Sequence, residues 1–222
     1  MSDFVLYNYF RSSSSFRIRI ALHLKKIQFE YSPVHLINNG GEQNSPTYRQ
    51  LNPSGEVPLL VHYKNSQLVA TIGQSMAIIQ YLEDILPSPQ LFPAGPEKKA
   101  EVIQFCEIIN SGIQPLHNLK ILNYLEKDLK ITSDQKIKWT QLWISSGLTT
   151  LEKLLEKTSG DYCFGDSITA ADCFLIPQIF AAARFEVSLD AFPLINKINN
   201  RCVQLEAFKK AHPSQQVDSP KT

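Results

Sequence analysis

The sequence predicts an α/β domain with a mixed four-stranded sheet, followed by an all-helical domain. Short β-prone runs alternate with amphipathic helical runs over residues 1–86. Prolines then cluster within residues 87–96 and break the periodicity, so we place a linker there. From residue 97 to residue 222 the hydrophobic pattern is helical, with no convincing strand. We therefore expect a domain at 1–86, a linker at 87–96 and a helical domain at 97–222.

The elements of the first domain are expected in the order β-α-β-α-β-β-α. A β-prone run ends at a serine-rich stretch, and the helix after it ends in two lysines, cations suited to a helix C-terminus. Pro33 restricts the second strand to an edge or to a strand end. Two apolar runs around Lys64-Asn65-Ser66 indicate a hairpin. The expected strands are 4–8, 29–36, 58–63 and 67–70, and the clearest helix is 75–86.

The second half is expected to hold four main helices and a loose, polar tail from His212 onward. The helices are predicted at 97–121, 133–157, 169–185 and 194–207. Thr169 and Asp172 have capping-box spacing, with Asp in place of the usual Glu or Gln. We interpret this pair as structural, the start of a buried helix, and its removal typically costs about 1 kcal/mol.

The overall composition argues against several classes of partner. The 22 Lys and Arg nearly balance the 21 Asp and Glu, which disfavours capture of nucleic acid or of an anionic membrane. No apolar run is long enough to cross a bilayer, and the first residues do not resemble a signal peptide. The 4 cysteines are widely spaced, so we expect reduced core residues, no metal site and a cytoplasmic protein.

Three short motifs could bind an anionic or peptide-like ligand. The four serines at 12–15 stand at a helix start, where free N–H groups and the helix dipole favour an anion. Taken alone, they are better explained by helix capping. A cis Val57-Pro58 bond would turn the valine N–H and C=O outward to pair with a ligand backbone, although trans is commoner. Ser75, after Gln74, is expected to cap the next helix and could meet a carboxylate.

Together these motifs, in this order, resemble the cytosolic glutathione transferases over roughly residues 4–213. The match is sharper for the zeta class. Ser14 stands where the zeta signature has a cysteine, which argues against a covalent or redox role there, and Phe16 replaces the usual tryptophan or histidine. The segments that match are 9–22, 36–43, 73–83, 113–118, 183–185 and 205–208.

The resemblance implies a thioredoxin-like N-terminal domain, a helical C-terminal domain, a homodimer, and glutathione as cofactor. It also implies roles for individual residues. Ser12, Ser13 and Arg17 would be catalytic, with Ser12 donating to the sulfur. Arg17 and Arg184 would bind a dicarboxylate substrate, although an ion pair for Arg17 and a solvated helix end for Arg184 are the alternatives. The residues implied for glutathione are Ser12, Ser14, Ser15, Arg17, Gln43, Val57, Gln74, Ser75, Gln114 and Asn118.

The implied reaction is cis–trans isomerisation of maleylacetoacetate to fumarylacetoacetate in tyrosine and phenylalanine catabolism. The thiolate adds to the cis double bond, the resulting single bond rotates, and elimination returns the trans isomer. Two alternatives stay open. One is another zeta-like activity, such as maleylpyruvate isomerisation, conjugation or dehalogenation. The other is a glutathione-binding module without turnover.

Overall fold

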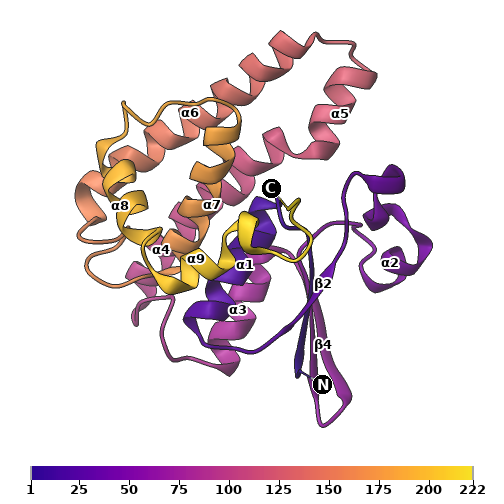
Figure 1. Ribbon diagram of the computed structural model, residues 1–222. Helices are drawn as coiled ribbons and strands as arrows, with labels where there is room; N and C mark the ends of the chain where they lie inside the picture. The colour runs from indigo at the N-terminus through magenta and orange to yellow at the C-terminus, as the bar shows by residue number, and fades with distance from the viewer. Residues whose placement is uncertain (1, 222) are drawn as a thin grey trace. The chain divides into compact units, whose positions relative to one another are not determined.

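The computed structural model describes residues 2–221 and contains the α/β layer and the helical region that the sequence predicts (Figure 1). The chain forms two compact units. The first comprises Met1–Gln90 and Leu205–Thr222, and the second comprises Leu91–Gln204. The expected division ran the helical domain to residue 222, whereas the C-terminal segment packs with the first unit. The reason is a set of contacts to the first long helix that the local sequence pattern does not reveal.

The first unit is built on a mixed sheet with the strand order β2-β1-β3-β4. β1 pairs parallel with β2 and antiparallel with β3, and β3 pairs antiparallel with β4. β2 is shorter than expected and is an edge strand that ends at Pro33, as the lack of a proline N–H requires. The strands are β1 Phe4–Asn8, β2 Glu30–Pro33, β3 Leu59–Lys64 and β4 Gln67–Gly73.

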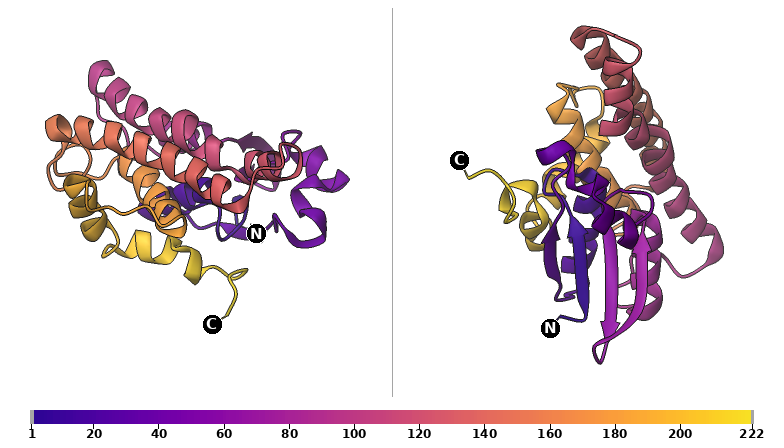
Figure 2. Two further views of the ribbon diagram at one scale, coloured as in Figure 1. Left: turned by 90° about the horizontal axis from the view of Figure 1, so that it is seen from above. Right: turned by 90° about the vertical axis from the view of Figure 1, so that its right-hand side faces the viewer.

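One face of the sheet is more deeply buried than the other. α1 and α3 pack side by side, and α9 packs against α1 (Figures 1 and 2). Along β1, Phe4, Leu6 and Asn8 are buried, whereas Val5 and Tyr7 are half-buried against the smaller cluster that includes Tyr48 of α2. This alternation is the two-residue period of a strand with one fully buried face. The helices of this unit are α1 Ser13–Leu24, α2 Pro46–Leu51, α3 Ser75–Ile85 and α9 Glu206–Ala211.

A buried lysine ties the C-terminal ends of α1 and α3 together. The Lys25 Nζ lies 2.7 Å from Glu83 Oε2 and donates to the carbonyl oxygens of Leu86 and Pro89, at 2.6 and 2.9 Å. These carbonyls follow the end of α3, where the helix dipole favours a cation. Because three acceptors surround the ammonium, its burial is compensated.

The second unit is helical, but its helices are more broken than the sequence predicts. The run expected over 97–121 is interrupted by a π-helical turn at Ile108–Ile113 and a 3₁₀ turn at Gln114–His117 that contains Pro115. Ile113 packs at Gly147, where an added Cβ would lie 2.2 Å from the Ile113 Cδ1. The run expected over 194–207 is divided between α8 and α9. The helices are α4 Pro96–Glu107, α5 Leu119–Lys127, α6 Ser133–Thr158, α7 Ala170–Arg184 and α8 Pro193–Cys202.

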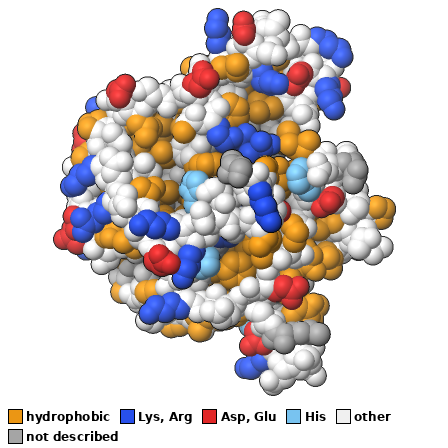
Figure 3. All heavy atoms as spheres, in the orientation of Figure 1, with side chains coloured by type: hydrophobic (Ala, Val, Ile, Leu, Met, Phe, Trp, Pro, Cys, Tyr) orange, Lys and Arg blue, Asp and Glu red, His pale blue; other side chains and the backbone are white. Residues whose placement is uncertain are grey.

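The cysteines lie in the core, as their spacing predicts. All 4 cysteines are buried, and residues 2–221 contain no disulfide. Within residues 2–221, no helix is both long and apolar enough to cross a membrane. Acidic and basic side chains are interspersed on the face that Figure 3 shows, as the near-zero net charge suggests.

The start of α7 is more heavily bonded than a simple cap. The fully buried Asp172 accepts from the Thr169 N–H at 2.8 Å, as the capping-box spacing predicts. It also accepts from the Thr169 hydroxyl at 3.2 Å and from the Cys163 N–H at 2.9 Å. The carboxylate therefore holds the loop before α7 as well as the helix start.

We expect Asp172→Ala to lower the free energy of unfolding by about 2–4 kcal/mol, because two buried N–H groups lose their acceptor. The exposed capping box of α6 provides the matched control: Thr132→Ala should cost about 1 kcal/mol. Urea unfolding measures both. Equal losses would show that the Cys163 contact contributes nothing.

Candidate functional site

The turn between β1 and α1 places Ser12 at the N-cap of α1. The Ser12 N–H donates to the Tyr9 carbonyl at 3.0 Å and closes the turn. The Ser12 Oγ then accepts from the Ser15 N–H at 3.2 Å, and its carbonyl accepts from the Phe16 N–H at 2.9 Å. Among residues 2–221 the Ser12 hydroxyl acts only as an acceptor, so its own hydrogen is available to a second partner.

This helix start has the chemistry of an anion site. The N–H groups of Ser13 and Ser14 belong to the first turn of α1, where no preceding carbonyl can accept from them. The first turn carries no acidic side chain, so the positive end of the helix dipole is not neutralised. Two N–H groups, one hydroxyl hydrogen and the dipole thus favour a negative charge beside Ser12.

The four serines differ in burial, and this separates their roles. Ser12 and Ser14 are half-buried, whereas Ser13 is buried and Ser15 has no exposed surface. Within residues 2–221, the Ser15 Oγ makes no hydrogen bond. A ligand cannot reach Ser15 without a rearrangement, so the expectation that this hydroxyl binds glutathione directly does not fit its position. Ser12 and Ser14 are the accessible hydroxyls.

Arg17 is fully buried, which rules out the surface ion pair considered for it. Its Nη1 donates to the Ser75 Oγ at 3.0 Å and so joins α1 to the start of α3.

Ser75 is the first residue of α3 and not its N-cap. The N-cap is Gln74, with a φ of 67°, and its side chain does not cap the helix. The sequence could not show this, because a Ser before a helical run is the usual cap.

Gln74 and Val57 lie on two loops that meet beside α3. The Gln74 Nε2 donates to the Glu56 Oε2 at 3.0 Å. The Glu56 carbonyl is fixed by the Tyr48 hydroxyl at 2.7 Å and the Asn52 amide at 2.8 Å. The Val57-Pro58 bond is cis, and across residues 2–221 the Val57 N–H and C=O make no hydrogen bond. The Val57 backbone pair is therefore unbonded, as predicted, although the residue itself is half-buried.

Glu56 is a candidate that the sequence analysis missed. Its carboxylate contacts Gln74, and it directly precedes the Val57-Pro58 bond. An acidic group at this place could accept from an ammonium group of a peptide-like ligand. The only sequence signal was an acidic residue next to the Val-Pro pair, and its partner is 18 residues away.

Gln43 follows a tight turn at Gly40-Gly41. The Gly41 φ is 93°, and an added Cβ there would lie 2.4 Å from the Gln43 Nε2. The Gln43 Nε2 donates to the Leu36 carbonyl at 3.3 Å. Its Oε1 is buried and has no hydrogen-bond partner among residues 2–221. The amide is thus held at one end and has an unused acceptor at the other.

The remaining predicted residues belong to the second unit. Gln114 begins the 3₁₀ turn, and Asn118 is the N-cap of α5, where it accepts from the Lys120 N–H at 3.0 Å. Arg184 is exposed at the last position of α7, with its guanidinium carbon 5.5 Å from the centre of the Phe185 ring. Their roles toward a ligand stay predictions.

The sequence of this chain matches known proteins along nearly its whole length. Family models described as the N-terminal and C-terminal domains of glutathione S-transferase match residues 11–85 and 144–197. The chain is 45% identical to maleylacetoacetate isomerase of Rattus norvegicus over 216 residues, which is 97% of this chain and 95% of the relative. The chain belongs to the glutathione transferase family.

Two solved structures match nearly the whole of this chain. A holo maleyl pyruvate isomerase, described as a bacterial glutathione-S-transferase of the zeta class, is 38% identical with a TM-score of 0.89. It is matched over 97% of this chain and 100% of its own. Maleylacetoacetate isomerase of Anaeromyxobacter dehalogenans, solved with bound GSH in the active site, is 34% identical with a TM-score of 0.89. That match covers 99% of this chain and 100% of the other. The expected family is confirmed.

The Arg17–Ser75 contact generates a stability prediction that needs no ligand. We expect Ser75→Ala to lower the free energy of unfolding by about 1.5–3 kcal/mol, because a buried guanidinium loses an acceptor. Ser14→Ala is the control, since a half-buried hydroxyl in the same site should change stability by less than about 0.5 kcal/mol. Denaturant unfolding of the free protein tests this. An unchanged free energy of unfolding in Ser75→Ala would show that the Arg17–Ser75 bond does not stabilise the fold.

Proposed function

We propose that this transferase is a glutathione-dependent isomerase that converts maleylacetoacetate to fumarylacetoacetate. The observation that carries the proposal is the start of α1, where Ser12 accepts from Ser15 and keeps its own hydrogen for an anion. The full-length similarity to isomerases of this substrate class supports the same activity. An acyclic dicarboxylate is then the substrate, and the reaction belongs to tyrosine and phenylalanine catabolism.

The donor set fits glutathione as the cofactor. The Val57 N–H and C=O offer a backbone pair to the peptide, and the Gln43 Oε1 offers a buried acceptor. The first-turn N–H groups of α3, with Gln74 beside them, suit the γ-glutamyl carboxylate. When bound, glutathione supplies a thiolate that adds reversibly to the cis double bond and leaves after the carbon–carbon bond has rotated. No oxidant or net proton is consumed.

Ser12 stabilises the sulfur anion and does not act as a base. A free thiol has a pKa of about 8.5, so only a few per cent is ionised at neutral pH. The Ser12 hydroxyl donates to the sulfur while its oxygen stays bonded to the Ser15 N–H, which fixes its orientation. The N–H groups of Ser13 and Ser14 add to the positive potential. Both effects lower the thiol pKa and raise the fraction of thiolate.

Arg17 and Arg184 were both expected to bind the substrate, but their burial suggests different roles. Because Arg17 is buried and donates to Ser75, we propose that it holds the cofactor side of the site and does not grip the substrate as an exposed clamp. Arg184 is exposed and can bind a carboxylate in a bidentate way. Gln114 and Asn118 remain proposed cofactor contacts. A homodimer in the cytoplasm completes the proposal.

The alternatives differ in measurable ways. We would assay cis–trans conversion of maleylacetone and maleylpyruvate, each with and without added glutathione. Conversion of the first substrate only in the presence of glutathione supports the proposal. A preference for maleylpyruvate favours the related isomerase. Retention on immobilised glutathione without any turnover indicates a binding module, and turnover without glutathione contradicts the mechanism.

Substitution of the helix-start hydroxyls tests which one meets the sulfur. We expect Ser12→Ala to lower kcat/KM by about 10- to 100-fold, because a hydrogen bond to a charged group contributes about 1.5–3 kcal/mol. Ser14→Ala should change kcat/KM by less than about twofold on the same scale. Ser12→Thr keeps a hydroxyl and a helix cap, so it should recover most of the activity. Equal losses in the Ser12 and Ser14 variants would show that the wrong hydroxyl was chosen.

A further inference from the structure

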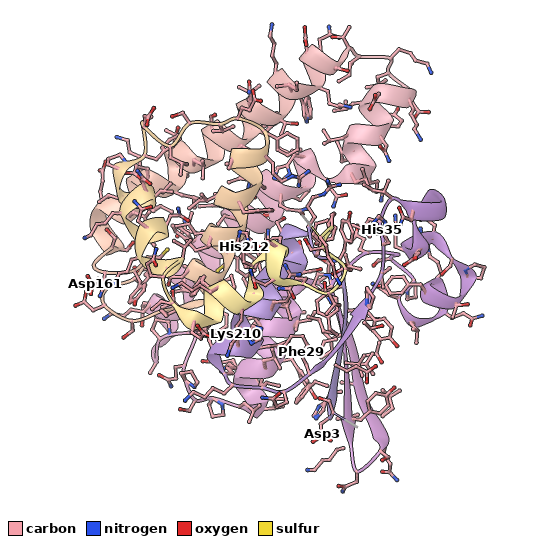
Figure 4. The ribbon with its side chains drawn as sticks, in the orientation of Figure 1. Asp3, Phe29, His35, Asp161, Lys210 and His212 are labelled. Atoms are coloured by element: carbon pink, nitrogen blue, oxygen red, sulfur yellow. The ribbon has the colours of Figure 1, made fainter. Side chains whose placement is uncertain are left out.

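The C-terminal segment of the first unit is ordered against the turn that precedes Ser12. The sequence predicted a loose tail from His212 onward, and the structure corrects this. Pro213–Gln215 forms a 3₁₀ turn, and the Gln216 Nε2 donates to the carbonyls of Lys210 and His212, both at 2.8 Å. His212 lies just after α9, where Figure 4 labels it. Its ring meets the Phe16 ring of α1 edge-on, with the ring centres 5.9 Å apart. The tail is therefore folded back on α1.

Asp218 binds the turn between β1 and α1. Its Oδ2 accepts from the Phe10 N–H at 3.0 Å, and its Oδ1 accepts from the Tyr31 hydroxyl. Tyr31 lies on β2 and pairs with Leu6 of β1. Asp218, 208 residues further along the chain, thus anchors Phe10 to the edge strand β2.

Arg19 binds the carbonyls of the same turn from within α1. Its guanidinium is fully buried and donates to the Asn8 Oδ1 at 3.0 Å, the Tyr9 carbonyl at 3.3 Å and the Phe10 carbonyl at 2.9 Å. Its Nε donates to the Ala211 carbonyl at 2.9 Å, at the end of α9. Burial lowers the pKa of Arg19 to about 10, so the group is still a cation at neutral pH.

These contacts converge on one peptide turn. The Tyr9 carbonyl, bound by Arg19, is also the acceptor of the Ser12 N–H, and the Phe10 N–H is the one held by Asp218. We propose that Arg19 and Asp218 are positioning residues for Ser12, with the 212–218 segment acting as a strap over the turn. This inference rests on the proposed role of Ser12 in lowering the thiol pKa. Neither residue touches the cofactor; each acts through the backbone that orients the Ser12 hydroxyl.

The strap is tested by titrating the thiol of glutathione bound to Asp218→Ala, followed by ultraviolet difference absorbance. We expect the pKa of the bound thiol to rise by about 0.5–1 unit, which reduces the thiolate fraction by about 3- to 10-fold at a pH well below that pKa and by less as the pH approaches it. Isomerase kcat should fall in proportion to the thiolate fraction at each pH and return toward the wild-type value at high pH. The Kd for glutathione should change by less than about twofold, since the peptide contacts are elsewhere.

Matched variants separate positioning from stability. Asp3→Ala removes an exposed carboxylate next to the other end of β1 and should leave the thiol pKa unchanged. Asp218→Asn keeps an oxygen acceptor for the Phe10 N–H, so its thiol pKa should lie between those of the wild-type and alanine proteins. Thermal unfolding of each variant shows whether the fold is intact. If Asp218→Ala folds and binds glutathione with an unchanged thiol pKa, the strap has no positioning role.

The wild-type protein distinguishes this inference from the proposed function. A lowered thiol pKa that rises in Asp218→Ala supports the strap even if maleylacetone is not isomerised, and that result overturns only the proposed reaction. A lowered pKa with full turnover that is insensitive to Asp218 overturns only the strap. An unperturbed thiol pKa in the wild-type protein overturns both.

Discussion

The burial of α1 is the constraint on which the first unit depends. This helix carries two arginines that have no exposed surface, and a lysine follows at its C-cap. A buried cation without acceptors is far too costly to keep, so each must reach polar groups on neighbouring segments. Arg17 reaches the start of α3, Lys25 reaches the end of α3, and Arg19 reaches the turn before Ser12. The packing of one helix therefore fixes the places of the others.

The same constraint explains how the candidate site can be rigid although several of its residues lie on loops or at helix ends. The Ser12 hydroxyl is held by the helix that it caps, and the backbone before it is held by Arg19. The loop that contains Val57 is held through the Glu56 carbonyl by Tyr48 and Asn52. Anion binding at a helix start needs donors that already point the right way, because reorientation would cost part of the binding energy.

Local sequence signals predicted the features that depend on local physics. The hairpin of β3 and β4, the edge position of Pro33 and the acid at position 172 follow from turn, strand and cap preferences over a few residues. The break at Ile108–Ile113 did not follow, because it accompanies the packing of Ile113 at Gly147 of another helix. The predictions of a Ser75 cap and of a loose tail were wrong for a similar reason. Ser75 bonds to Arg17, and the C-terminal segment bonds to Arg19, and both contacts join residues that are distant in sequence. Glu56 was missed because its contact with Gln74 exists only after both loops have folded.

The first unit is discontinuous in sequence, and this has a consequence for how the chain is made. Residues 205–222 are synthesised after the whole second unit, yet they supply the Ala211 carbonyl and the Asp218 carboxylate to a unit whose sheet is synthesised first. Until Ala211 and Asp218 have been synthesised, the Arg19 guanidinium lacks one of its acceptors and the Phe10 N–H lacks its carboxylate. The second unit is thus synthesised before the last contacts of the first unit can form.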